Sequence, residues 1–275
     1  MELNPLKSAF DRLCRISPNI KRALWRTWYN YLVKMDKDAE LLFMNYGYAE
    51  LEPNDQLLPL QAAEEKYRYC IQLYHHVAQA IDLTDKEVLE VGCGRGGGAA
   101  YLATHFRPAM MQGVDFSQNA IEFCKKYHAV VPNLTFVHGD AEALPFEADS
   151  FDVAVNVESS HSYGTIAHFF SEVYRVLRPQ GYFLLADFRD APDISVLQQQ
   201  LRATRFQIVQ EEIITRNIVK ALELDHDRKV QIVRQKVPGI LYKPFLTFAA
   251  TKNSKTYATF NSGETEYLYF ILQKV

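Results

Sequence analysis

The sequence predicts an α/β protein, with a largely parallel sheet that carries helices on both faces. Between residues 88 and 214, short apolar runs alternate with amphipathic stretches of helical length. Strands that alternate with helices form parallel sheets. The apolar runs also lack a polar side, which is expected of strands buried on both faces.

The predicted elements follow in a simple order after a first helix over 60–80. Strands are expected at 88–91, 110–115, 134–138, 151–159, 182–188 and 206–214, with helices at 97–106, 117–128, 166–177 and 194–204. Ser117 is a typical N-cap, and Pro179 with Gly181 ends the helix before the fifth strand. A last strand at 266–275 is expected to lie antiparallel beside the sixth.

Two segments lie outside this alternation. Residues 1–80 are expected to form an N-terminal helical cap, and residues 81–275 the main domain. Within that domain, residues 215–262 separate the last two strands. An insertion of this length inside a compact domain is usually a lid or a binding element.

Composition and charge exclude several classes of protein. The 275 residues are 48% hydrophobic and carry a formal net charge of −3, which argues against a general nucleic-acid binder. The four cysteines form no CxxC pair and no cluster with histidine, so neither a metal site nor a disulfide framework is expected. No apolar run approaches the ~20 residues of a spanning helix and no signal peptide is predicted, so a cytoplasmic location is expected.

Residues 1–37 carry a local excess of positive charge, with eight Lys or Arg against three acids. Trp25, Trp28, Tyr29 and Leu32 recur there at helical spacing. Two interpretations stay open. A basic helix with tryptophan can make peripheral contact with an anionic membrane, and the same stripe can instead pack on the domain.

The residues that carry chemistry begin with VLEVGCGRGGGAA, at 88–100. Gly92, Gly94 and Gly97 match a GxGxxG spacing between a strand and a helix. Glycine lets the backbone meet a ligand there, and the helix N-terminus adds a positive dipole end. Asp115 ends the next strand and can accept both hydroxyls of a ribose. Together they predict an adenosine-type cofactor, either a dinucleotide or S-adenosylmethionine.

Further features favour S-adenosylmethionine. Glu90 stands two residues before the first glycine, where an acid helps to fix the loop around the amino-acid end of the cofactor. Asp140 and Ala141 follow the third strand, placed for the adenine edge. The antiparallel last strand is not typical of nucleotide dehydrogenases, and no tyrosine has the lysine four residues on that a short-chain dehydrogenase needs.

Over roughly residues 86–190 the chain resembles the class I S-adenosylmethionine-dependent methyltransferases, which have a Rossmann-like seven-stranded sheet. The ordered motifs that carry this resemblance are VLEVGCGRGGG, GVDFS, GDAEALPF, FDVAVNVESSHSY and VYRVLRPQGYFLLADF. LFMNYGY, NVESSHSY and YATFNSGETEYLYFIL are similar to the bacterial phthiotriol/phenolphthiotriol dimycocerosate and fatty-acid O-methyltransferases. The resemblance implies methyl transfer to a hydroxyl or carboxyl oxygen of a hydrophobic lipid or polyketide.

The resemblance also implies cofactor-binding roles. Those residues are Gly92, Cys93, Gly94 and Gly96 with Glu90 at the methionine part, Asp115 at the ribose, Phe116, Asp140 and Ala141 at the adenine, and Asn156 and Val157 at the amino group. Tyr46 is expected to close over the cofactor from the N-terminal helices. For Gly97 and Gly98, helix packing stays open as the alternative to ligand contact.

His161 is the candidate general base. It follows the fourth strand, at the edge where open α/β sheets bind ligands, and an alcohol acceptor needs a base at neutral pH. Glu158 and Asp187 end the fourth and fifth strands and are placed to orient His161 or the acceptor; a structural role is the alternative for each of the three. In the lid, three aromatic residues either line an apolar acceptor pocket or form the lid core: Tyr242, Phe245 and Phe248.

Three other functions stay open. A C-methyltransferase acting on an isoprenoid, indole or sterol-like acceptor would use Glu158 and the aromatic lid to steady a carbocation. A protein that binds S-adenosylmethionine without transferring its methyl group would keep the same glycine loop. A dinucleotide oxidoreductase would bind NAD.

Overall fold

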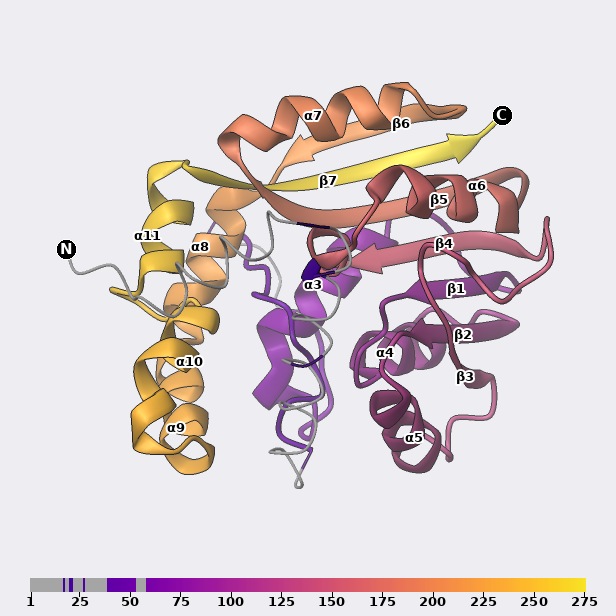
Figure 1. Ribbon diagram of the computed structural model, residues 1–275. Coiled ribbons are helices and arrows are strands. Elements are labelled where there is room, and N and C mark those ends of the chain that lie inside the picture. The colour runs from indigo at the N-terminus through magenta and orange to yellow at the C-terminus, as the bar shows by residue number, and fades with distance from the viewer. Residues whose placement is uncertain (1–16, 18–19, 22–26, 28–38, 53–57) are drawn as a thin grey trace.

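The computed structural model describes residues 17, 20–21, 27, 39–52 and 58–275. At its centre is a seven-stranded sheet with the order β3-β2-β1-β4-β5-β7-β6 (Figure 1). The strands are β1 (Glu87–Val91), β2 (Met110–Asp115), β3 (Leu134–His138), β4 (Phe151–Val157), β5 (Leu177–Asp190), β6 (Phe206–Ile213) and β7 (Thr265–Lys274). Each of the seven overlaps a strand predicted from the apolar runs, and β5 begins earlier than predicted.

The last strand enters the sheet between two others. β1 to β5 pair in parallel, while β7 runs antiparallel to both β5 and β6. The prediction of an antiparallel last strand beside the sixth is therefore confirmed, and β7 has β5 as its second neighbour. This order brings Tyr267 of β7 beside Phe188 of β5, close to the carboxyl ends of the parallel strands.

The start of β5 differs from the prediction. Pro179 and Gly181 were expected to lie before the strand, but β5 begins at Leu177 and contains both. Gln180 has a positive φ of 66°, and the pairing with β4 shifts register between Phe151 and Val153. The chain thus continues into the strand through an irregular turn rather than a separate loop.

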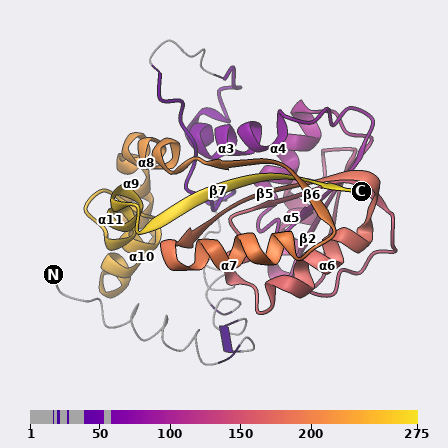
Figure 2. The ribbon, with the colours of Figure 1, turned by 90° about the horizontal axis from the view of Figure 1, so that it is seen from above.

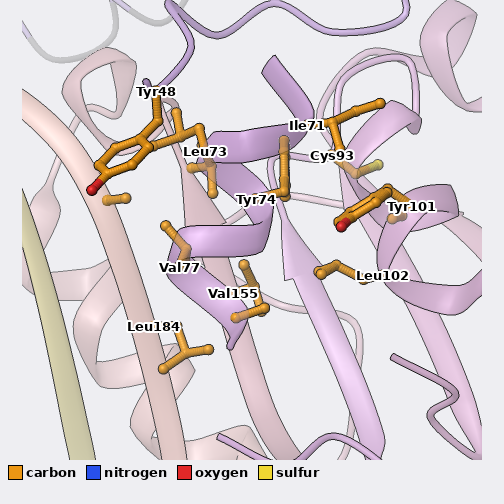
Figure 3. Packing of buried hydrophobic residues seen from close by; sticks show 14 of the residues in the cluster. Tyr48, Ile71, Leu73, Tyr74, Val77, Cys93, Tyr101, Leu102, Val155 and Leu184 are labelled. Carbon is orange, nitrogen blue, oxygen red and sulfur yellow. The ribbon is translucent and has the colours of Figure 1, made fainter. Parts of the chain in front are cut away.

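Helices cover both faces of the sheet. One face carries α3 (Arg68–Ala78, after the 3-10 turn η1, Glu65–Tyr67), α4 (Gly97–His105) and α5 (Gln118–Tyr127), and the other carries α6 (Ile166–Val176) and α7 (Ala191–Arg202) (Figure 2). Leu73 and Val77 of α3 pack toward Val155 and Leu184 of the strands (Figure 3). The Ser117 Oγ accepts the N–H of Ala120 at 3.3 Å, so the predicted N-cap is confirmed.

The insertion between β6 and β7 is helical. It contains α8 (Thr215–Leu224), α9 (His226–Lys236), η3 (Gly239–Leu241), α10 (Tyr242–Phe248) and α11 (Lys255–Ser262). These helices, the lid, stand together at the end of the molecule toward which β4 points (Figure 1). α8 packs on α11, and α9 on α10.

The segment 39–52 crosses between the lid and α3 without forming a helix or strand. Tyr46 therefore comes from irregular chain rather than from an N-terminal helix. The aromatic stripe of Trp25, Trp28, Tyr29 and Leu32 lies outside the described residues. In the part of the chain that the structure describes, no helix combines the length and apolar character needed to cross a bilayer.

Candidate active site

A cavity of about 130 Å³ lies at the carboxyl ends of β1, β2 and β4, where open α/β sheets bind their ligands. Residues 42–45 also line it. Many of the predicted site residues line it: Gly92, Cys93, Gly94, Asp115, Phe116, Asp140, Ala141, Val157 and Glu158.

The glycine loop and Asp115 form one unit. Gly92 and Gly94 have positive φ values of 77° and 52°, which glycine adopts without steric cost. The Gly94 N–H donates to Oδ2 of Asp115 at 2.9 Å, and the Ser117 N–H donates to Oδ1 at 2.8 Å. Burial raises the pKa of Asp115. The carboxylate thus joins the loop to the start of α5.

Glu90 lies behind the loop rather than in the cavity wall. The Tyr74 hydroxyl of α3 donates to Glu90 Oε1 at 2.6 Å. Burial raises the pKa of Glu90 to about 7, although the hydroxyl of Tyr74 opposes the shift. A Cβ at Gly98 would lie 2.0 Å from Cζ of Tyr74, so this glycine makes room for the tyrosine. Tyr74 also lines the cavity, and no local pattern in the sequence distinguishes it from the other apolar-face residues of its helix.

Three further predicted cofactor residues do not line the cavity. Gly96 is instead the N-cap of α4, in a left-handed conformation. The Asn156 side chain is buried, and its Nδ2 donates to the carbonyl oxygen of Val91 at 2.8 Å, which ties β4 to the end of β1. The Tyr46 ring packs on Phe188 and Phe260, at 5.5 and 5.4 Å between centroids.

Met44 and Asn45, which neighbour Tyr46, take the place in the cavity wall that was expected for the tyrosine. Asn45 Nδ2 donates to the carbonyl oxygen of Cys70 at 3.3 Å. Its Oδ1 is buried and has no hydrogen-bond partner among the described residues. LFMNYGY is the sequence signal that could have led to both residues.

Glu158 combines strain, burial and contact with the cavity. Its φ is +48°, in a region that a residue other than glycine adopts at a cost. Its Oε1 accepts the Tyr46 N–H at 2.6 Å. Burial raises the pKa of Glu158 to about 8, and the nearby charge of Asp187 adds to the shift. At neutral pH the carboxyl group is therefore mostly protonated.

His161 and Asp187 meet beside Glu158. Nδ1 of His161 lies 2.9 Å from Oδ1 of Asp187, and the His161 backbone N–H donates to Oδ2 at 2.8 Å. Burial alone would raise the pKa of Asp187, but the charges of His161 and Arg189 hold it below its ordinary value. The histidine ring stacks on Phe188 at 4.4 Å. A carboxylate that orients an imidazole through Nδ1 is the arrangement of a general base.

The predicted acceptor residues form the inside of the lid. Phe245 is buried and packs with Val233, and Tyr242 and Phe248 lie partly buried against them. The hydroxyl of Tyr242 accepts a hydrogen bond from Arg234 Nε at 2.7 Å. None of the three predicted residues lines the cavity. Met44 connects the two regions, because it packs in this lid cluster and also lines the cavity.

Known proteins are similar to this chain over most of its length. Residues 89–185 match the family model described as a methyltransferase domain. The chain is 38% identical over 272 residues to the fatty-acid O-methyltransferase of Mycolicibacterium smegmatis, covering 98% of this chain and 97% of that protein. It is 37% identical over 258 residues to the phthiotriol/phenolphthiotriol dimycocerosates methyltransferase of Mycobacterium tuberculosis, covering 94% of each.

The chain belongs to the S-adenosylmethionine-dependent methyltransferases. The cyclopropane synthase MmaA2 of Mycobacterium tuberculosis has the same fold, with a TM-score of 0.71 at 16% identity over 88% of this chain and 95% of that one. The expected Rossmann-like sheet of this family is thereby confirmed.

The side chains that line the cavity of this methyltransferase fit S-adenosylmethionine. Its lining contains four acidic side chains against one cation, Arg95: Asp115, Asp140, Glu142 and Glu158. The carboxyl groups of Asp115, Asp140 and Glu142 suit a ligand that carries a sulfonium, an ammonium group and ribose hydroxyls, while Glu158 is mostly protonated at neutral pH. Among the residues that the structure describes, no group of three or more His, Cys, Asp or Glu is placed to hold a metal ion.

Proposed function

We propose that this methyltransferase transfers the methyl group of S-adenosylmethionine to a hydroxyl or carboxyl oxygen of a hydrophobic lipid or polyketide-type acceptor. Gly92, Gly94 and Val157 would hold the methionine part, with Asp115 at the ribose and Phe116 at the adenine. The two relatives named above act, by their names, on fatty acids and on phthiotriol/phenolphthiotriol dimycocerosates, and these lipid-related names support a hydrophobic acceptor.

One observation carries the acceptor class. Met44 lines the cofactor cavity beside Gly94, where a Cβ on the glycine would lie 2.7 Å from the Met44 methyl carbon. The same side chain packs with Phe245 and Leu246 in the apolar lid cluster. The cavity therefore adjoins a region of apolar side chains, and such a region suits an acceptor whose reactive oxygen sits on a hydrocarbon body.

The residues beside the cavity would supply the base for the acceptor hydroxyl and hold that base in position. S-adenosylmethionine, when bound, provides a methyl group already activated by its sulfonium, so the protein chiefly aligns the acceptor oxygen. Asp187 holds the His161 ring through Nδ1, and His161 would take the proton from a hydroxyl acceptor. A carboxylic acid acceptor would need no base, because it is already ionised at neutral pH.

The test is product analysis with labelled cofactor. The purified enzyme is incubated with methyl-labelled S-adenosylmethionine and separate panels of long-chain alcohols and fatty acids. We expect a new O–CH3 group on at least one panel, and none on short, water-soluble analogues of the same functional group. A new C–CH3 carbon would instead support the carbocation chemistry of a C-methyltransferase, and binding without transfer to either panel would contradict the proposal.

A further inference from the structure

We propose that Lys229, in helix α9 of the lid, is a positioning residue that holds the Glu158 carboxyl group through the backbone of Tyr46. The effect of Lys229 on turnover rests on the proposed function. Its effect on the ionisation and the position of the Glu158 carboxyl group does not. The sequence motifs of the glycine loop and of the strand ends do not predict a role for Lys229.

Lys229 is buried, with only 9% of its surface exposed. Its Nζ donates to the backbone carbonyl oxygen of Tyr46 at 3.3 Å and lies 5.7 Å from the centroid of the Tyr46 ring. A buried ammonium group is costly unless it is paired or hydrogen-bonded. The buried ammonium group of this lid lysine is therefore stabilised by hydrogen bonding to the Tyr46 carbonyl oxygen, in a segment distant in sequence.

Tyr46 connects this lysine to the site. Its N–H donates to Glu158 Oε1 at 2.6 Å, while its carbonyl oxygen accepts from Lys229. Its hydroxyl donates to the carbonyl oxygen of Phe248 at 3.2 Å, and its ring packs on Phe260. Tyr46 is thus held by α9, α10 and α11 while its N–H points at Glu158, so a shift of the lid would move the donor that orients this carboxyl group.

Nearby acidic groups favour the charged form of the buried Lys229 side chain. Burial lowers the pKa of Lys229, while Asp225, at the junction of α8 and α9, and Glu158 oppose that shift. Asp225 also pairs with Arg228, whose Nε donates to Asp225 Oδ1 at 2.6 Å. The titratable groups that face Glu158 come from four elements: Asp187 of β5, Tyr267 of β7, Tyr74 and Cys70 of α3, and Lys229 of α9. Among these groups, Lys229 is the cation.

The decisive experiment follows the proton on Glu158 directly. The full chain is labelled with ¹³C at the glutamate carboxyl carbons, and the Glu158 signal is assigned by its loss in Glu158→Gln. The signal is then titrated in the wild type and in Lys229→Met, which keeps an unbranched side chain, one atom shorter, and removes the charge. Lys220→Met, on the exposed face of the neighbouring lid helix α8, is the matched control.

In Lys229→Met, we expect the titration midpoint of Glu158 to rise by about one pH unit. The variant no longer holds the Tyr46 N–H, whose hydrogen bond favours the ionised carboxylate, and it also loses a nearby opposite charge. Lys220→Met should leave the midpoint unchanged, and Lys229→Arg, which keeps the cation, should stay near the wild type. An unchanged midpoint in folded Lys229→Met would overturn the proposal. If that variant does not fold, Lys229→Gln replaces it in the same titration, with the same outcomes.

Turnover supplies the second readout. With an accepted substrate, Lys229→Met should lower kcat about tenfold, and the affinity for S-adenosylhomocysteine should stay unchanged. In the Glu158→Gln background the same substitution should have little further effect, because residues that act through one another are not additive. The titration needs no acceptor, so a failure of the proposed function, seen as absent methyl transfer, is distinguishable from a failure of this proposal.

Discussion

His161 is held by Asp187 at one edge and by Phe188 at one face. The Nδ1–Oδ1 distance is 2.9 Å and the ring centroids of His161 and Phe188 lie 4.4 Å apart. Because the carboxylate takes up Nδ1, the Nε2 atom is directed away from Asp187. The ring is therefore held in one orientation, although neither His161 nor Asp187 lines the cavity, and this orientation has testable consequences for the proposed proton transfer.

Replacing Asp187 should impair turnover more than cofactor binding. In Asp187→Asn the imidazole loses the negative charge that orients it and stabilises its protonated form, so we expect kcat for a hydroxyl acceptor to fall by about 100-fold or more. Calorimetric titration with S-adenosylhomocysteine should give an unchanged affinity. His168→Ala, on the exposed surface of α6, is the control. Full turnover in Asp187→Asn would remove the pair from the mechanism.

Replacing Asp115 should impair cofactor binding rather than turnover alone. Its carboxylate accepts the N–H groups of Gly94 and Ser117, and hydrogen bonds to a charged group contribute about 1.5–3 kcal/mol. We expect Asp115→Asn to weaken S-adenosylhomocysteine binding by roughly 10- to 100-fold, measured by calorimetry. Asp193→Asn, exposed on α7, serves as the matched substitution. Wild-type affinity in Asp115→Asn would show that this carboxylate holds neither the loop nor the ribose.

Gly98→Ala should destabilise the fold. The added Cβ would lie 2.0 Å from the Tyr74 ring, so the tyrosine must move and its hydrogen bond to Glu90 is disturbed. Overpacking of this kind costs about 1–3 kcal/mol in the free energy of unfolding, which urea denaturation measures. Gly239→Ala is the control, since its added Cβ would meet no atom within 4 Å. Equal stabilities for the two variants would contradict the close packing of Tyr74 on α4.

The ionisation of Glu90 should make stability depend on pH. Its pKa is raised to about 7 in the folded chain, against about 4.3 in an unfolded one. The stabilising contribution of the protonated group is thus complete below the unfolded pKa and is lost as pH rises through 7. Glu90→Gln cannot ionise, so its stability does not fall in this way. The free energy of unfolding of the variant minus that of the wild type should therefore increase by about 2 kcal/mol from pH 5 to pH 7.

Urea denaturation at a series of pH values, without cofactor, measures this difference. Glu147→Gln, at an exposed position, should show no such gain. A difference between Glu90→Gln and the wild type that stays constant with pH would mean that Glu90 does not titrate in this range.

The sequence by itself determined the α/β class, the order of the strands along the chain and the class of cofactor. Apolar runs, the Ser117 cap and the glycine loop are local signals, because each depends on residues within one turn or one strand. The predicted residues of the loop and of the strand ends meet in one cavity since the carboxyl ends of parallel strands share one edge of a sheet. Asp115 at the end of β2 and Val157 at the end of β4 meet in this way.

Only the tertiary structure decided which side chains complete the site. Tyr74 meets Glu90 because α3 packs on α4 and on the sheet. Met44, not Tyr46, lies in the cavity wall, in a segment, 39–52, that is irregular chain rather than helix. Lys229 reaches the Tyr46 carbonyl 183 residues away along the chain. Such contacts depend on how whole elements pack, and a pattern within one element contains no information about the partner that it will meet.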